Sequence, residues 1–553
     1  MKLTGSQIVM EVLLEQGVNT VFGYPGGTAL NIYDELYKYS DKIKHILTAH
    51  EQGACHAADG YARATGKTGV VMSTSGPGAT NLVTGIATAY MDSIPLIAIT
   101  ANVPDNLIGR DAFQEICITG VTMPITKHNF FVNDIDDLAD TLREAFRIAG
   151  SGRKGPVLVD ITKDVTAAVT EFEKKDAARP SPLPEIKMED VEKIAAMINK
   201  AKKPVAYIGG GVVASDAADE VRALVDKVNI PVTYTLMAAG VIGHDHPHNL
   251  GMLGMHGSIS ANKAISQADF VLTLGARFSD RVALNTKSFA KKADIAMVDI
   301  DKSEFSKNVP VDVCCIGDVK DFLDKLLPLV DEAEHPEWDE TIVQWKEKEK
   351  VVKAPDCKLH PVDIIDIMCD KAGKDTIYVT DVGQHQMWAP QYIKHNATKK
   401  FLTSGGLGTM GYGYGAAIGA QFACPDNRVI HITGDGSFHM NLNEACTAVS
   451  NNLPIITIIM NNQVLGMVYQ WQTAFYGKRF SNTTPERKTD FVKLIEAFGG
   501  TGYRAETPQQ FAEAMDKALL DDGPVWIDCR ISREERVLPM IPPGKSVENM
   551  IID

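Results

Sequence analysis

The sequence has few of the features that mark several classes of protein. Its 553 residues contain no apolar run approaching 18 residues, so we expect no membrane-spanning helix. Basic residues are in the minority, 55 against 70 acidic ones, and the net charge of −15 disfavours binding to nucleic acid. The nine cysteines are scattered without a CxxC pair, which is typical of reduced thiols and not of a disulfide framework. Glu11 and Glu15 argue against a signal or transit peptide, so we expect a cytoplasmic protein.

Short apolar segments alternate with helical periods along the whole chain. Continuous apolar strands that end in Gly, Ser, Asp or Asn are typical of parallel sheets buried on both faces. The pattern predicts an α/β protein of doubly wound parallel-sheet domains, with ligands at the carboxyl ends of the strands. The expected strands are 68–74, 94–100, 156–162, 204–210, 270–276, 295–301, 376–382, 428–436 and 454–462.

Two charged, proline-containing segments interrupt this alternation. Residues 171–192 and 331–361 have the composition of connections between domains. They divide the chain into three expected domains, which span residues 1–170, 186–332 and 360–553. Each has an ordinary domain size.

The strongest chemical signal lies at the ends of two expected neighbouring strands. Asp435, in the segment GDGSF, follows one strand, and Asn461-Asn462 follows the next. A carboxylate, an amide oxygen and a backbone carbonyl suit Mg²⁺, with a diphosphate completing the octahedron. We expect a helix over 437–449 to direct its positive N-terminus at the phosphates.

This pairing resembles the thiamin diphosphate fingerprint of a family of decarboxylases and carboligases. Further motifs agree with it in order along the chain. The first third carries GYPGG (23–27), HEQGACHAADGYAR (50–63), STSGPGATN (73–81), DAFQE (111–115) and TKHN (126–129). The last third carries GQHQMW (383–388), GGLGTMGYG (405–413) and GMVYQWQ (466–472).

Within that family the chain is similar to the catalytic large subunit of acetohydroxyacid synthase. GMHG (254–257) and ARFSDR (276–281), together with DAFQE, TKHN and GMVYQWQ, carry this likeness. The resemblance implies condensation of two pyruvate to 2-acetolactate and CO₂, or of pyruvate with 2-oxobutanoate, in branched-chain amino acid biosynthesis. The alternatives are a flavin-dependent pyruvate oxidase, a catabolic acetolactate synthase lacking FAD, and a non-catalytic member of the fold.

The resemblance also implies the residues of the thiamin diphosphate site. Glu51 matches the carboxyl group that faces the aminopyrimidine ring; a helix cap is its ordinary alternative. Glu51, Gln114 and Gly27 are the implied catalytic residues. The implied cofactor contacts are Glu51, Pro25, Thr74, Asn81, Gly383, Gln384, His385, Met410, Gly434, Gly436, Ser437 and Met467, and the implied Mg²⁺ ligands are Asp435, Asn462 and Val464.

The middle domain carries the expected flavin site. The implied FAD contacts are Arg153, Gly209, Gly210, Met255, His256, Gly257, Gly275, Arg277, Asp299 and Asp318. FAD in this family is largely structural, because the net reaction is not a redox one. The implied substrate channel is lined by Phe113, Lys127, Arg281 and Trp471.

The resemblance further implies a homodimer or tetramer whose active sites lie between subunits, and it allows a small regulatory subunit. Three positions depart from the family pattern. They are Tyr414-Gly415, where Leu-Pro is usual, Pro390, where Ala is usual, and Met123, where Arg is usual. The first predicts a looser helix start near the cofactor, and the last removes a positive charge near the channel.

Overall fold

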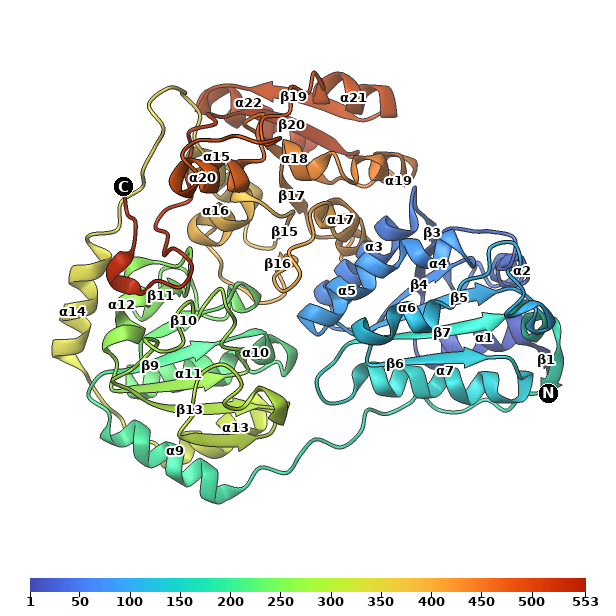
Figure 1. The fold of residues 1–553 in the computed structure, drawn as a ribbon, viewed down its shortest axis with the longest axis horizontal. Coiled ribbons are helices and arrows are strands. Elements are labelled where there is room, and N and C mark those ends of the chain that lie inside the picture. The colour runs from blue at the N-terminus through green and yellow to red at the C-terminus, as the bar shows by residue number, and fades with distance from the viewer.

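The structure, a computed structural model, describes residues 1–553 and contains three parallel six-stranded sheets, each flanked by helices (Figure 1). A small antiparallel pair, β1 (Lys2–Thr4) with β8 (Val169–Glu171), lies outside them. The doubly wound α/β prediction is confirmed. Each sheet falls inside one of the three predicted domains, whose boundaries stay predictions.

The first sheet has the order β3-β2-β4-β5-β7-β6. Its strands are β2 (Thr20–Gly23), β3 (Lys44–Leu47), β4 (Gly69–Ser73), β5 (Leu96–Asn102), β6 (His128–Val132) and β7 (Pro156–Thr162). Its helices are α1 (Gly5–Glu15), α2 (Leu30–Lys38), α3 (Glu51–Thr65), α4 (Pro77–Asn81), α5 (Val83–Asp92), α6 (Ile118–Thr122), α7 (Ile135–Gly150) and α8 (Lys163–Ala167). Thr4 begins α1 with a capping box, in which its hydroxyl accepts from Gln7 N–H and the Gln7 side chain accepts from Thr4 N–H.

The middle sheet has the order β11-β10-β9-β12-β13-β14. Its strands are β9 (Pro204–Ile208), β10 (Val232–Tyr234), β11 (Asn249–Met252), β12 (Phe270–Leu274), β13 (Asp294–Asp299) and β14 (Val313–Ile316). Its helices are α9 (Met188–Lys200), α10 (Gly210–Ala214), α11 (Ala218–Val228), α12 (Ile259–Gln267) and α13 (Val319–Leu326).

The third sheet has the order β16-β15-β17-β18-β20-β19. Its strands are β15 (Ile377–Thr380), β16 (Phe401–Leu402), β17 (Val429–Gly434), β18 (Ile456–Asn461), β19 (Thr501–Ala505) and β20 (Val525–Arg530). Its helices are α15 (Pro361–Ala372), α16 (Gln384–Tyr392), α17 (Tyr412–Ala423), α18 (Asp435–Phe438), α19 (Ala445–Ser450), α20 (Gly466–Phe475), α21 (Phe491–Phe498) and α22 (Pro508–Leu520).

The first and third sheets share one topology. Numbered within each sheet, both run 2-1-3-4-6-5, whereas the middle sheet runs 3-2-1-4-5-6, the order of dinucleotide-binding folds. The shared order supports an origin of the outer two domains by duplication, for which the sequence offers only a loose strand-helix rhythm.

The first and third domains meet through α3 and α17, which lie against each other at the centre of Figure 1. Glycines allow the two helices to approach closely. A Cβ at Gly419 would clash with the carbonyl of Ala57, and one at Gly60 with the carbonyl of Ala416. The buried side chains on both sides form one continuous apolar core, which makes this contact a fixed part of the fold.

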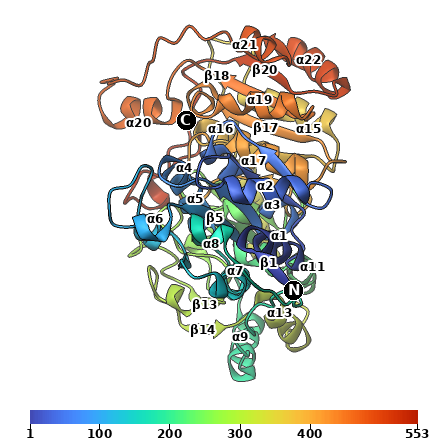
Figure 2. The same cartoon turned by 90° about the vertical axis from the view of Figure 1, so that its right-hand side faces the viewer.

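The two predicted connections differ in structure. Residues 172–187 contain no helix or strand and run from the first domain to α9, whereas 331–361 contains α14 (Pro336–Lys346) (Figure 1). The C-terminal segment after β20 turns back toward α12 of the middle domain (Figures 1 and 2). None of the helices combines the length and apolar character that a membrane crossing requires.

The prediction of a single helix over 437–449 is wrong. The structure has the four-residue α18, a 3-10 turn over Leu442–Glu444, and then α19. Asn441 interrupts the segment, because its side chain donates to the carbonyl of Gly411 at 3.1 Å. A helix of one turn offers little macrodipole, so the contribution that we expect from a helix N-terminus to phosphate binding is small here.

Candidate active site

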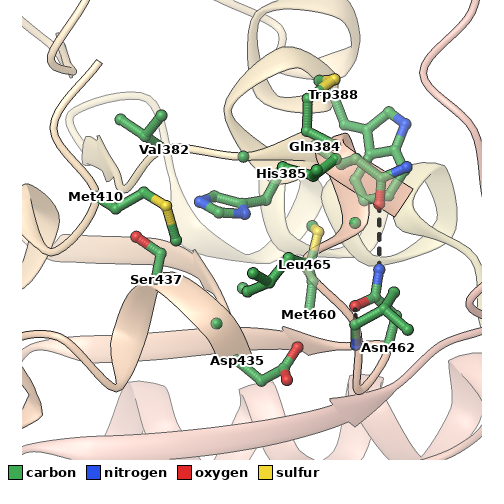
Figure 3. A pocket seen from close by; sticks show the side chains of 17 residues that line it. Val382, Gln384, His385, Trp388, Met410, Asp435, Ser437, Met460, Asn462 and Leu465 are labelled. Carbon is green, nitrogen blue, oxygen red and sulfur yellow. Dashed lines mark hydrogen bonds between the residues drawn. The ribbon is translucent and has the colours of Figure 1, made fainter. Parts of the chain in front are cut away.

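A cleft lies at the carboxyl edge of the third sheet (Figure 3). All of its lining residues lie between Val382 and Val468, at the ends of β17 and β18 or in the segments that follow β15, β16, β17 and β18. The lining residues predicted from sequence are Gly383, Gln384, His385, Met410, Gly434, Asp435, Gly436, Ser437, Asn462, Val464 and Met467. The rule that ligands bind beyond the strand ends therefore located this cleft.

Asp435 is the only acidic side chain that lines the cleft, and one of its two carboxylate oxygens has no hydrogen bond inside the protein. It is 4% exposed, and its Oδ1 is buried without a hydrogen bond. Burial raises the pKa of its carboxyl group to about 6. A buried carboxylate oxygen without a hydrogen bond is costly, so this position fits a bound cation.

Asn462 reaches the same cleft from the end of β18, to the right of Asp435 in Figure 3. Its Nδ2 donates to Gln384 Oε1 at 3.1 Å, which leaves its Oδ1 facing Val464 N–H at 3.2 Å (Figure 3). Gln384 in turn donates to the main-chain oxygen of Glu535 at 2.8 Å. This chain of bonds fixes the amide orientation, so an oxygen and not a nitrogen is directed toward Val464.

Close backbone approach shapes the wall around His385. A Cβ at Gly434 would lie 2.9 Å from the His385 ring, as would one at Gly383. The ring is buried, its Nε2 has no hydrogen-bond partner, and burial lowers its pKa to about 4. A neutral imidazole in this position can donate or accept one hydrogen bond with a bound polar group.

Met410 enters the cleft from the side opposite Asn462 (Figure 3). Its loop is anchored to the first domain, since Asp92 accepts from the N–H groups of Gly405 and Gly406 at 3.0 and 2.7 Å. Arg63 pairs with Asp92 at 2.8 Å. Both of these side chains are buried, so the position of Met410 depends on contacts between domains.

A second group of predicted residues gathers at the carboxyl edge of the first sheet. Glu51 is the first residue of α3, and its Oε2 accepts from Asn81 Nδ2 at 2.9 Å. Thr74 follows β4, and its hydroxyl forms a hydrogen bond with that of Thr28 at 2.9 Å. Gln114, whose own φ is 63°, lies against Gly76. None of these residues lines the cleft. Pro25 and Gly27 are exposed in the loop after β2.

The structure places Lys127 away from this edge. It precedes β6, at the amino end of the strand, and its Nζ donates to the carbonyls of Ile148 and Ser151 at 2.5 and 2.6 Å. Burial lowers its pKa to about 8. Its role within one chain is therefore to bind the C-terminal carbonyls of α7.

Lys163 lies at the carboxyl edge of the first sheet. It follows β7, and its Nζ donates to the carbonyl of Gly27 at 3.2 Å. The sequence analysis missed it, although its place directly after an expected strand is the signal that identified Asp435. Gln470, which donates to Val537 and accepts from Gln384, was missed because both of its partners are distant in sequence.

Most predicted flavin residues lie at the carboxyl edge of the middle sheet. Gly209 directly follows β9, Gly275 directly follows β12 and Asp299 ends β13. Gly211 approaches Gly275 so closely that a Cβ on Gly211 would lie 2.6 Å from the Cα of Gly275. Gly210 begins α10, and Gly257 and the buried Met255 and His256 lie between β11 and α12. His256 Nδ1 is buried without a partner, which suits a polar ligand.

Three predicted flavin contacts already have protein partners. Arg153 donates to Ser93 and Glu304 at 2.9 and 2.8 Å, and Arg277 donates to the carbonyl of Met91 at 3.1 Å. Asp318 caps α13, where it accepts from two backbone N–H groups. Arg153 and Arg277 therefore join the middle domain to the first, and a ligand would share them with these partners.

The predicted channel residues divide between two regions. Trp471 on α20 packs against the cluster of Met255, Leu538 and Met540, and Met255 N–H donates to the carbonyl of Arg281. Arg281 and Trp471 thus lie near the junction of the middle and third domains. Phe113 lies on the first domain and is 87% exposed, which is unusual for so large an apolar side chain.

The Tyr414-Gly415 departure has a structural explanation that differs from the expectation of a loose helix. Tyr414 is buried in the first turn of α17, and its hydroxyl accepts from Trp526 Nε1 at 3.2 Å. A Cβ at Gly415 would lie 2.8 Å from the carbonyl of Gly53 on α3. The helix start is tightly packed. Pro390 lies inside α16, and Met123 is exposed.

Comparison with known proteins assigns this architecture to a family. Three models of thiamine pyrophosphate enzymes match, namely the N-terminal binding domain over residues 3–123, the central domain over 191–326 and the C-terminal binding domain over 381–529. Thiamine pyrophosphate is another name for thiamin diphosphate.

Whole-length relatives agree with these domain matches. The chain is 44% identical to the acetolactate synthase large subunit of Pyropia yezoensis, with 99% of this chain and 95% of the relative covered. It is also 44% identical to a probable acetolactate synthase large subunit of Methanocaldococcus jannaschii (99% and 95% covered) and to an acetolactate synthase of Mycobacterium bovis (99% and 91%). The chain therefore belongs to the thiamine pyrophosphate enzyme family and, within it, to the acetolactate synthase large subunits.

Proposed function

We propose that this chain uses thiamin diphosphate to condense two molecules of pyruvate into 2-acetolactate and CO₂, a step of branched-chain amino acid biosynthesis. One observation carries the proposal furthest. Asp435, a buried carboxylate with one unpartnered oxygen, and Asn462 lie at adjacent strand ends in a glycine-walled cleft of a chain that is 44% identical to acetolactate synthases.

The residues of the cleft have a clear division of labour under this proposal. Asp435, Asn462 and the carbonyl of Val464 would hold Mg²⁺, and His385, Gln384 and the backbone of Gly434 to Ser437 would bind the diphosphate. Met410 would set the bend of the cofactor. When bound, thiamin diphosphate supplies a nucleophilic carbon that cleaves and forms bonds next to a carbonyl group.

Glu51 would hold and release a proton at the pyrimidine ring. Its carboxyl group lies at the helix start, oriented by the hydrogen bond from Asn81. Gln114, Gly27 and Phe113 at the same edge would position the 2-oxo acids and exclude water.

FAD would bind at the carboxyl edge of the middle sheet in a structural role. The close approach of Gly211 to Gly275, the buried Asp299 and the unpartnered Nδ1 of His256 support this assignment. Condensation of two pyruvate transfers no net electrons, so the proposed reaction requires no redox step of FAD.

A complete active site would require a second copy of the chain. The cleft is lined by the third domain alone. Within the same chain, the start of α3 is held outside the cleft, because the backbone N–H groups of Ala49 and His50 donate to the carboxylate of Glu444, which does not line it. We therefore propose a homodimer in which Glu51 of one copy serves the cleft of the other.

Mixing two inactive variants tests this arrangement. Glu51→Gln and Asp435→Ala are each expected to be nearly inactive. In random mixed dimers half of the molecules are heterodimers with one intact site of two, so about a quarter of wild-type activity should return. Equal mixtures that stay inactive after unfolding and refolding together, under conditions in which the wild type recovers, would contradict sites built from two chains.

Trp471→Leu is expected to lower the preference for 2-oxobutanoate over pyruvate as the acceptor. The indole packs beside Met255 at the domain junction, and one methylene in an apolar pocket is worth about 1–3 kcal/mol, so the preference should fall about tenfold or more. Competition between the two acceptors, with product analysis, measures the effect. Tyr476→Leu, at an exposed aromatic residue directly after the same helix, serves as the control, and a product ratio unchanged by Trp471→Leu would reject this role.

The reaction itself is tested by supplying pyruvate, thiamin diphosphate and Mg²⁺ with and without FAD. Acetolactate and CO₂ in equal amounts support the proposal. Acetate or acetyl phosphate with hydrogen peroxide would indicate the alternative, a flavin-dependent pyruvate oxidase. Activity that is independent of FAD would indicate the catabolic type of acetolactate synthase.

A further inference from the structure

A cluster of three potential metal ligands lies outside the cleft. Cys357 and His360 precede α15 in the connection to the third domain, and Glu535 lies in the C-terminal segment. Their Sγ, Nδ1 and carboxylate oxygen atoms all lie within 4.8 Å of one another. Glu535 is 3% exposed, whereas Cys357 and His360 are half-buried beside the exposed Asp356 and Lys358, which leaves a route in from solvent.

The distances between these atoms approach those around a tetrahedral ion. Cys357 Sγ lies 3.6 Å from His360 Nδ1 and 3.7 Å from Glu535 Oε1. Ligands of tetrahedral Zn²⁺ are separated by about 3.6 Å for sulfur to nitrogen and about 3.3 Å for nitrogen to oxygen. Only the 2.6 Å hydrogen bond between His360 and Glu535 would have to lengthen, by about 0.7 Å.

The geometry favours metal binding over nucleophilic catalysis. A catalytic Cys-His-carboxylate arrangement uses both ring nitrogens, one toward the thiol and the other toward the carboxylate. Here the same atom, His360 Nδ1, faces both the thiol and the carboxylate. Three ligand atoms that converge on one point, with no fourth protein ligand, describe an open coordination site.

We propose that Cys357, His360 and Glu535 bind one Zn²⁺ ion, with water in the fourth position. A thiolate, an imidazole and a carboxylate suit zinc and exclude Mg²⁺, which prefers oxygen ligands. On binding, the thiol of Cys357 releases its proton to solvent, and the proton between His360 Nδ1 and Glu535 moves to Nε2 of the ring or to solvent. Sulfur, nitrogen and oxygen then each donate one electron pair to the ion.

The site would join the connection to the C-terminal segment next to the cleft. The main-chain oxygen of Glu535 accepts from Gln384, whose side chain also holds Asn462. An ion at Glu535 would therefore restrain the segment that supports Gln384, and we expect zinc to raise the apparent melting temperature of the enzyme.

Cobalt serves as a visible probe for this site. Full-length enzyme is saturated with thiamin diphosphate and Mg²⁺, so that the cleft is occupied, and is then titrated with Co²⁺ and back-titrated with Zn²⁺. We expect one equivalent of tetrahedral Co²⁺ with a thiolate charge-transfer band, displaced by Zn²⁺. Cys369→Ser, a half-buried cysteine on α15 outside the cluster, is the matched control and should behave as wild type.

Two variants make the outcome decisive. Cys357→Ser should abolish the thiolate band and weaken zinc binding by about tenfold or more, since even indirect supports of a metal ligand contribute that much. Glu535→Gln, which keeps the size of the side chain, should weaken binding similarly while keeping the band. A wild-type enzyme without the band, or a band that persists in Cys357→Ser, would overturn the proposal. Neither result bears on the carboligase assignment, because the titration does not measure turnover.

Discussion

Replacing Glu51 by Gln should slow exchange of the thiazolium C2 proton of bound thiamin diphosphate by about 10²–10⁴-fold, the usual contribution of general acid-base catalysis. Gln keeps the size of the side chain and the partner Asn81, but it cannot take up and release a proton. kcat should fall in parallel, whereas cofactor affinity should change little, because the diphosphate end binds elsewhere.

The measurement is deuterium exchange at C2, followed by NMR after acid quench. Glu11→Gln is a suitable control, because Glu11 is a half-buried carboxyl group that accepts from Tyr39 on the far side of the first domain. Exchange at the wild-type rate in Glu51→Gln would mean that Glu51 is only the first residue of a helix, placed there by the helix dipole.

Asp435→Ala should remove Mg²⁺ and thiamin diphosphate binding together. The variant removes the only carboxylate in the cleft, and because indirect supports of a metal ligand already contribute 10–100-fold, we expect cofactor affinity to fall by about 100-fold or more. Calorimetry with thiamin diphosphate at fixed Mg²⁺ tests this. Asp426→Ala, at an exposed turn before β17, is the control, and unchanged affinity in Asp435→Ala would remove the metal assignment.

The same variant should not destabilise the protein in the absence of cofactor. Burial raises the pKa of Asp435 to about 6, above its ordinary value near 4, so the ionised form opposes folding. The free-energy cost of burying the charge is absent below about pH 4 and grows as pH rises from about 4 to about 6. At higher pH the cost is constant. Relative to the wild type, cofactor-free Asp435→Ala should therefore gain thermal stability over that pH window, which separates lost binding from unfolding.

Sequence reasoning succeeded where chemistry follows directly from local structure. Apolar runs such as 429–434 and 456–461 form buried strands, and their carboxyl ends are marked by Asp435 and Asn462. It missed Lys163, whose contact with the carbonyl of Gly27 forms only in the folded chain. It also failed at the segment after Asp435, where the contact between Asn441 and Gly411 overrides the helical pattern.

The sequence by itself determined the strand and helix alternation, the family, and the residue types at the strand ends, because these depend on backbone hydrogen bonding and side-chain periodicity within a few residues. Only the tertiary structure decided which distant groups meet. His360 and Glu535 are 175 residues apart and form a hydrogen bond, and Gln384 links the cleft to the C-terminal segment. Such pairs depend on how the surfaces of whole domains pack, and no local pattern encodes that packing.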